Sequence, residues 1–185
     1  MKNLSKVTFK NSTVLLAGCT GTLGEAVLRK LLEHNCIVLC PIRDLPERFR
    51  GISANYDNVR FFITKSFDSD CTKEICQRFK KIDVIISCIG SRKGTLEECK
   101  DVELEYNQNL LKIAKTLGST QFLLLSAICV QKPKLIFQKY KLRFEKELKK
   151  SKVSYTIVRP TAFFKSLSGQ IERIKSGKRF IVFDN

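Results

Sequence analysis

A glycine-rich loop, G-x-x-G-x-x-G over residues 18–24, connects an apolar run to an amphipathic segment. The apolar run Thr13–Ala17 predicts a strand, and apolar residues at helical spacing within 22–34 predict a helix. In this setting the glycines permit a tight turn and let backbone N–H groups approach a pyrophosphate, which the helix N-terminus also favours. The sequence therefore predicts a nucleotide-binding βαβ unit. Its candidate contact residues are Gly18, Thr20, Gly21, Thr22, Leu23 and Gly24.

Strand and helix patterns alternate along the rest of the chain. Short apolar runs predict strands over residues 36–40, 59–63, 82–88, 121–126, 153–158 and 179–183. Helical spacing of apolar residues predicts helices over residues 72–79, 101–117, 134–150 and 163–175. This alternation is typical of an α/β fold with a doubly wound, mostly parallel sheet of the Rossmann type.

The end of the second predicted strand bears on the choice of cofactor. Arg43 stands where domains that bind NAD usually have an acidic residue for the ribose hydroxyls. Its planar, charged fork suits a 2′-phosphate, so we expect NADPH rather than NADH. Two other interpretations stay open: Asp44 could bind the ribose of NADH, and Arg43 could be a surface arginine.

Residues at the ends of later strands are further candidates. Cys88, Ile89 and Gly90 end and follow the fourth predicted strand, and Ser126 ends the fifth. The carboxyl ends of parallel strands share one edge of the sheet, where a dinucleotide binds. We therefore expect these four residues to line the site, although a serine at a strand end is often only a turn residue.

Lys141 stands in an apolar stripe of the predicted helix 134–150, together with Phe137, Phe144 and Leu148. A lysine in such a stripe needs a partner for its ammonium group, and a cofactor ribose would be one. The alternative is a side chain that snorkels to solvent. Because the lysine should cost stability without its ligand, we expect Lys141→Met to leave the fold as stable or more stable.

Composition excludes several other classes of function. Hydrophobic residues make up 43% of the 185 residues, and no apolar run approaches the roughly 18 residues of a membrane span. One histidine, His34, and eight cysteines without a CxxC pair argue against a metal site. The net charge of +16 comes from basic residues spread along the chain. We do not expect nucleic acid as a partner, although an RNA-associated Rossmann domain stays an alternative, and peripheral membrane association is left open.

Ser126 and Lys141 resemble the serine and lysine of the atypical branch of the short-chain dehydrogenase/reductase superfamily. That superfamily has Tyr-x-x-x-Lys on the helix after the serine, and here Phe137 replaces the tyrosine. Three segments resemble the 3,8-divinyl (proto)chlorophyllide 8-vinyl reductases more specifically. They are ISCIGSR at 86–92, SAICVQKP at 126–133 and RPTAFFKSL at 159–167. Phenylalanine at the tyrosine position also occurs in that family.

This resemblance implies NADPH-dependent reduction of the C8 vinyl group of a tetrapyrrole to ethyl, in a plastid or in the cytoplasm of a phototrophic bacterium. It implies Lys141 and Ser126 as catalytic residues, and Lys141, Pro160 and Thr161 as cofactor contacts. It divides the chain into a tail 1–12, an NAD(P)-binding domain 13–160 and the beginning of a substrate-side region 161–185, truncated relative to the family. The alternative is a non-catalytic NADP(H)-binding module or sensor.

Overall fold

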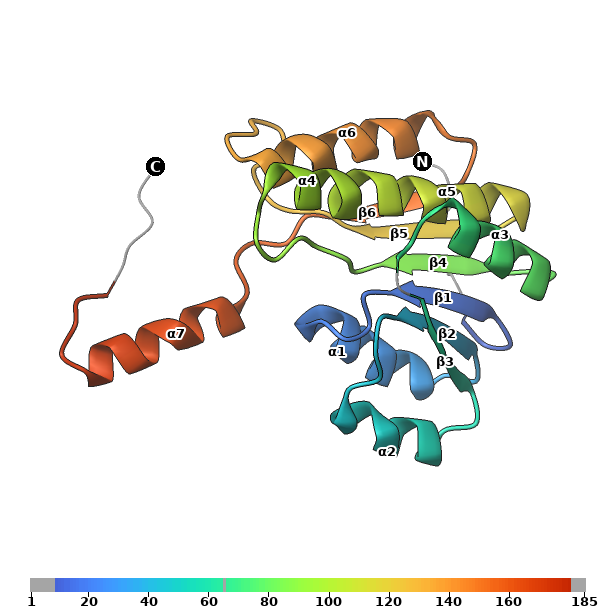
Figure 1. The fold of residues 1–185 in the computed structure, drawn as a ribbon, viewed down its shortest axis with the longest axis horizontal. Helices are drawn as coiled ribbons and strands as arrows, with labels where there is room; N and C mark the ends of the chain where they lie inside the picture. Colours follow the sequence, from blue (N-terminus) through green and yellow to red (C-terminus); the bar gives the residue numbers. More distant parts are fainter. Residues whose placement is uncertain (1–8, 65, 181–185) are drawn as a thin grey trace, which may run out of the picture.

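Six parallel strands form one sheet in the computed structural model, which describes residues 9–64 and 66–180. Their spatial order is β3-β2-β1-β4-β5-β6, so the strand order reverses between β1 and β4 (Figure 1). The strands are β1 (Thr13–Ala17), β2 (Ile37–Ile42), β3 (Val59–Ile63), β4 (Val84–Ser87), β5 (Gln121–Leu125) and β6 (Tyr155–Val158). The predicted doubly wound α/β fold of the Rossmann type is confirmed.

Helices cover both faces of the sheet, as a parallel sheet requires. The helices of the described residues are α1 (Thr22–Leu32), α2 (Glu47–Asn55), α3 (Ser69–Arg78), α4 (Leu96–Cys99), η1 (Lys100–Glu105), α5 (Tyr106–Thr116), α6 (Ile136–Lys150) and α7 (Phe164–Lys175). Helices α1 and α2 lie on one face, and α3, α5 and α6 lie on the other (Figure 1). Along β1, Leu15 packs with the second group while Val14 and Leu16 pack with the first. Both faces of this central strand are therefore buried.

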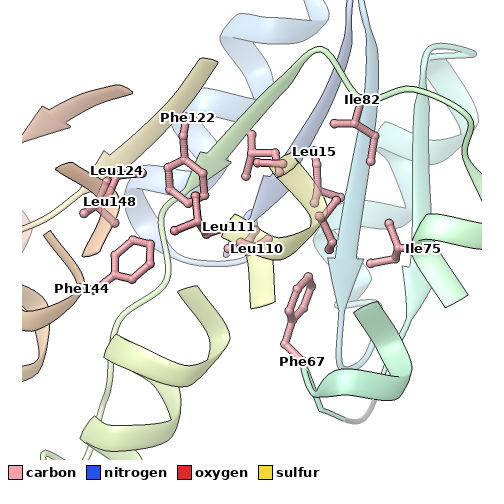
Figure 2. Packing of buried hydrophobic residues seen from close by; sticks show 14 of the residues in the cluster. Leu15, Phe67, Ile75, Ile82, Leu110, Leu111, Phe122, Leu124, Phe144 and Leu148 are labelled. Atoms are coloured by element: carbon pink, nitrogen blue, oxygen red, sulfur yellow. The ribbon is translucent and has the colours of Figure 1, made fainter. Parts of the chain in front are cut away.

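The core beneath α5 and α6 fixes these helices on the sheet (Figure 2). Phe122 of β5 packs against Phe144 of α6 with ring centroids 5.8 Å apart, and Leu148 lies one turn further along α6. All three side chains are fully buried. Burial of such side chains contributes roughly 1.5–3 kcal/mol each. This packing sets the rotation of α6 and thereby directs Lys141 and Glu145 of α6 toward the end of β5.

Two local differences from the predicted elements have physical causes. Helix α2 was not predicted, because its sequence ERFRGISAN has few apolar residues and includes Gly51, a poor helix former. Strand β2 continues through Pro41 to Ile42 rather than ending at residue 40. Its pairing with β1 stops at Leu39, so the missing N–H of Pro41 falls where no ladder bond is needed.

The predicted helix 101–117 is the later part of one continuous helix formed by α4, η1 and α5. Thr95 begins it by accepting a hydrogen bond from the Glu98 N–H (3.3 Å). Its middle segment, Lys100–Glu105, is a π-helix, a form that is frequent at functional sites.

The last predicted elements have different outcomes. Helix α7 confirms the predicted helix 163–175 and extends away from the sheet (Figure 1). The strand predicted over 179–183 falls mostly outside the described residues, and its described part, Arg179 and Phe180, belongs to no strand. The division of the chain at residue 160 stays a prediction. None of the helices in the described part of the chain is long and apolar enough to cross a membrane.

Candidate functional site

The glycine-rich loop lies where the strand order reverses, between β1 and β4. Gly18 has a φ of 82°, and a Cβ at this position would lie 2.7 Å from the carbonyl carbon of Cys88, just after β4. The N–H of Gly21 donates to the carbonyl of Gly18 (3.1 Å) and closes the turn. Glycine is therefore required at position 18 both by its backbone conformation and by the close approach of two strand ends.

Gly24 and Gly21 have opposite surroundings. A Cβ at Gly24, in the first turn of α1, would lie 2.0 Å from the carbonyl oxygen of Gly18, so α1 packs directly on the loop. A Cβ at Gly21 would meet only that oxygen, at 3.4 Å. Open space beside Gly21 is what a phosphate group needs to approach the loop and the N-terminus of α1.

A cavity of about 500 Å³ is lined by this loop and by the carboxyl ends of the neighbouring strands. Its size falls in the range of ligand sites, roughly 300–1,000 Å³. The structure brings these sequence-predicted cofactor contacts together in its wall: Gly18, Thr20, Gly21, Arg43, Cys88, Ile89 and Gly90. The side chain of Arg43 is exposed to solvent.

The other predicted site residues do not line this cavity, as far as the described residues define it. They are Thr22, Leu23, Gly24, Ser126, Lys141, Pro160 and Thr161. The first three form the first turn of α1, immediately after the loop. The last four lie at the end of β5, on α6 and after β6. Their assignment as cofactor or catalytic residues stays a prediction.

Several residues of the cavity wall were not among the cofactor contacts assigned from the sequence, although the segments 64–68 and 87–92 were placed beside the cofactor. They are contributed by the loop after β3, the loop after β4 and the long helix, and include Thr64, Ser66, Phe67, Arg92, Lys93 and Tyr106. Topology indicates both segments, because those after β3 and β4 begin at the same sheet edge. Asp68, the acidic residue of the first of these loops, accepts N–H groups of Asp70 and Cys71 and caps α3.

Cys88 contributes a neutral surface to this wall. Burial raises the pKa of the Cys88 thiol to about 11, and nearby Cys19 adds to the effect. The thiolate is the nucleophilic form of cysteine, and it is scarce at neutral pH when the pKa is this high. Cys88 is therefore suited to packing beside a ligand rather than to covalent chemistry.

Arg48 of α2 supports the glycine-rich loop from outside. Its guanidinium donates to the carbonyl of Thr20 (2.8 Å) and to the carboxylate of Glu25 (3.1 Å). A hydrogen bond from Arg29 lowers the pKa of Glu25, and Arg48 adds to this effect against the opposing effect of burial. The two arginines offset a negative charge in the first turn of α1, where an anionic ligand would otherwise be repelled.

Lys141 has a protein partner that the sequence did not indicate. Its ammonium lies 2.7 Å from Oε2 of Glu103 in η1, and both side chains are buried, with 10% and 2% of their surface exposed. Among the described residues this oxygen receives no well-aligned hydrogen bond, so the contact acts through charge. The other oxygen of Glu103 accepts the N–H and hydroxyl of Ser91 (both 2.8 Å). Glu103 thus joins α6 to the loop that continues from Gly90.

Ser126 belongs to a separate polar network. Its hydroxyl donates to Glu145 of α6 (2.6 Å), a fully buried carboxylate that also pairs with Arg159 through both guanidinium positions. The N–H of Ile128 donates to the carbonyl of Pro160 (3.0 Å). The network therefore holds the segments after β5 and β6 against α6, and it engages the hydroxyl of Ser126.

The Glu145 network should make stability depend on pH. Burial alone would raise the pKa of Glu145, but hydrogen bonds from Arg159 and Ser126 outweigh it and lower the pKa below its usual 4.5. A lowered folded-state pKa contributes stability above the unfolded value, and this contribution is lost as the pH falls through the folded value. We expect Glu145→Gln to lower the free energy of unfolding by about 1–3 kcal/mol at neutral pH.

Urea unfolding of wild type and Glu145→Gln at a series of pH values measures this dependence. The stability difference between the two proteins should narrow as the pH drops below 4.5. A difference that stays constant down to roughly pH 3 would show that Glu145 acts through packing rather than charge.

A parallel sheet in this order, with a glycine-rich loop and a cavity where the order reverses, defines a Rossmann-type dinucleotide-binding protein. The model of the NAD(P)H-binding family matches residues 18–182. The chain belongs to this family.

The chain is also similar in sequence to curated relatives and in fold to solved structures. It is 37% identical to the chloroplastic divinyl chlorophyllide a 8-vinyl-reductase of Arabidopsis thaliana, over 94% of this chain and 45% of that protein. It is 26% identical to the photosystem II assembly factor Ycf39 of Guillardia theta, over 85% of this chain and 49% of that protein. The Bordetella bronchiseptica enzyme WbmH, solved with NAD+, has the same fold (TM-score 0.73, 16% identity, 91% of this chain and 64% of that one). The chain spans less than half the length of the curated relatives it matches.

Proposed function

We propose that this chain is an NADPH-dependent reductase that converts the C8 vinyl group of divinyl (proto)chlorophyllide to ethyl. The observation that carries the proposal is the 37% identity to the Arabidopsis thaliana reductase along 94% of this chain. The cavity at the glycine-rich loop supports it, because its size and position suit a dinucleotide. The tetrapyrrole substrate, and a plastid or the cytoplasm of a phototrophic bacterium as the place of action, belong to the same proposal.

The residues of the cavity would hold the cofactor, which when bound supplies the hydride. Gly18 gives the loop its turn, and the space beside Gly21 admits the pyrophosphate to the N-terminus of α1. Arg43 would bind the 2′-phosphate, while Cys88 and Gly90 form a neutral wall. The supporting ion pairs of Glu25 keep the loop in place and its surroundings free of an uncompensated negative charge.

Lys141 and Ser126 are the proposed catalytic residues, with Pro160 and Thr161 beside the cofactor. Lys141 would have to break its ion pair with Glu103 before it could contact a substrate. Ser126 would likewise have to break its hydrogen bond to Glu145. Phe137 needs no hydroxyl in this proposal, because reduction of a vinyl group forms no alkoxide that a phenol would protonate.

The activity is tested by single-turnover reduction of divinyl chlorophyllide with NADPH, which is monitored through the shift in pigment absorption. A parallel measurement of binding to vesicles of anionic lipid tests whether the net charge of +16 serves a membrane surface. Binding of NADPH without any turnover would contradict the reductase proposal for this chain.

Arg43→Ala should discriminate between the two nicotinamide cofactors. A 2′-phosphate carries close to two negative charges, so removal of the guanidinium should weaken NADPH binding by about 1–3 kcal/mol. NADH lacks this phosphate, and its binding should barely change. Isothermal titration calorimetry with both cofactors measures the difference, and equal losses would contradict the assignment of Arg43.

A non-catalytic NADP(H)-binding module is the second candidate function. The observation that favours it is the 26% identity to the photosystem II assembly factor Ycf39 of Guillardia theta. Such a module would bind NADPH at the same cavity and show no turnover with divinyl chlorophyllide. The single-turnover experiment therefore separates the two candidates.

A further inference from the structure

Three basic side chains on two different loops line the cavity without forming an ion pair, and the carboxylates of Glu98 and Asp101 lie in the same wall. Arg43 comes from the loop after β2, and Arg92 and Lys93 come from the loop after β4. Within residues 9–64 and 66–180, none of the three forms an ion pair, whereas Arg48 and Arg159 both do. A cluster of unpaired cations around a cavity indicates a site for an anion.

Glu98 explains why the cations of the second loop stay unpaired. Its carboxylate, close to both of them in sequence, accepts the backbone N–H groups of Arg92 (3.0 Å), Lys93 (2.7 Å) and Gly94 (2.9 Å) instead. Hydrogen bonding from the Arg92 N–H, with those of the other two, lowers the pKa of Glu98, so the carboxylate stays charged. The loop is thus held in one conformation, and its basic side chains are left for a ligand.

A loop ordered in advance binds at lower entropic cost. Gly94 has a φ of 72°, which gives the turn that presents its N–H to Glu98, and Thr95 then begins α4. The Glu98 carboxylate binds these backbone N–H groups, and its charge also acts on that of Lys93 without a direct ion pair between the two side chains.

We infer that Arg92 and Lys93, together with Arg43, form a site for the phosphorylated adenosine ribose of NADP(H). This inference rests on the cofactor part of the proposed function. The pyrophosphate already has the backbone N–H groups of the glycine-rich loop and the N-terminus of α1. The charge that NADP(H) carries in addition, close to two negative units, is left for the side-chain cations. Arg92 and Lys93 are therefore specificity-determining residues that act together with Arg43.

The experiment is calorimetric titration of the full chain with two probes, 2′,5′-ADP and 5′-AMP, which differ only in the 2′-phosphate. Arg92→Ala and Lys93→Ala should each weaken binding of 2′,5′-ADP about tenfold and change 5′-AMP less than about twofold, the effect of one charge-assisted hydrogen bond. Arg60→Ala is the matched control, because Arg60 is an exposed arginine of β3 outside the cavity. It should change neither affinity.

The outcomes separate this inference from the proposed cofactor. If wild type prefers 2′,5′-ADP and both variants keep that preference, the inference is wrong while NADPH binding stands. If both probes are weakened equally, the second loop serves the shared 5′-phosphate and the inference is again wrong. If wild type shows no preference for 2′,5′-ADP, the NADPH proposal and this inference fail together. Thermal melting of each variant confirms that the affinities refer to folded protein.

Discussion

Lys141→Met should lower the free energy of unfolding by about 3–5 kcal/mol, the usual cost of removing one partner of a buried ion pair. The substitution leaves the Glu103 side chain 2% exposed and without the ammonium of Lys141, although Ser91 still donates two hydrogen bonds to it. Urea unfolding at neutral pH, followed by circular dichroism, measures the loss. This expectation reverses the one drawn from the sequence, in which the lysine had no partner in the protein.

A second substitution and a matched control make the expectation specific to the pair. Glu103→Leu combined with Lys141→Met should recover part of the loss, because two apolar side chains often replace a buried ion pair at little cost, while the N–H and hydroxyl of Ser91 lose their acceptor. Lys146→Met on the same helix removes an exposed lysine and should change stability by less than about 0.5 kcal/mol. If Lys141→Met alone is as stable as wild type, burial of Glu103 does not require the ammonium of Lys141.

Most of the fold could be predicted from the sequence because the strands are buried on both faces of the sheet. Continuous apolar runs such as those of β1 and β4 leave little choice of element, and the glycine-rich loop fixes how the first strand meets the first helix. The missed helix α2 buries only Phe49 and Ile52 of its apolar side chains, so its pattern is weak. The π-helix has no local sequence pattern that distinguishes it from the α-helix around it.

The candidate site was predictable only where backbone topology determines it. Arg43 and Cys88 could be assigned to one cavity because parallel strands share a carboxyl edge. The partners of Lys141 and Ser126 could not, because Glu103 and Glu145 approach them through tertiary packing at sequence separations that no pattern encodes. A lysine in an apolar stripe indicates that some partner exists, and only the folded chain identifies it.

Gly21→Val should abolish binding of NADPH and NADH while the protein stays folded. Gly21 has φ −82° and ψ 166°, extended values that valine adopts readily, and its Cβ would meet only the carbonyl oxygen of Gly18, at 3.4 Å. The branched side chain would instead occupy the space through which a pyrophosphate reaches the loop. Calorimetric titration with both cofactors, together with thermal melting, measures the two expectations separately.

Gly24→Ala is the informative counterpart, because it places a smaller group where the fold has no room. Its Cβ would lie 2.0 Å from the carbonyl oxygen of Gly18, so α1 or the loop must shift, at a cost of about 1–3 kcal/mol or more. A valine that blocks binding without lowering the melting temperature, beside an alanine that lowers it, would locate the phosphate at Gly21 and the packing constraint at Gly24. If Gly21→Val retains either cofactor with unchanged affinity, the pyrophosphate is held elsewhere and the loop is only a structural turn.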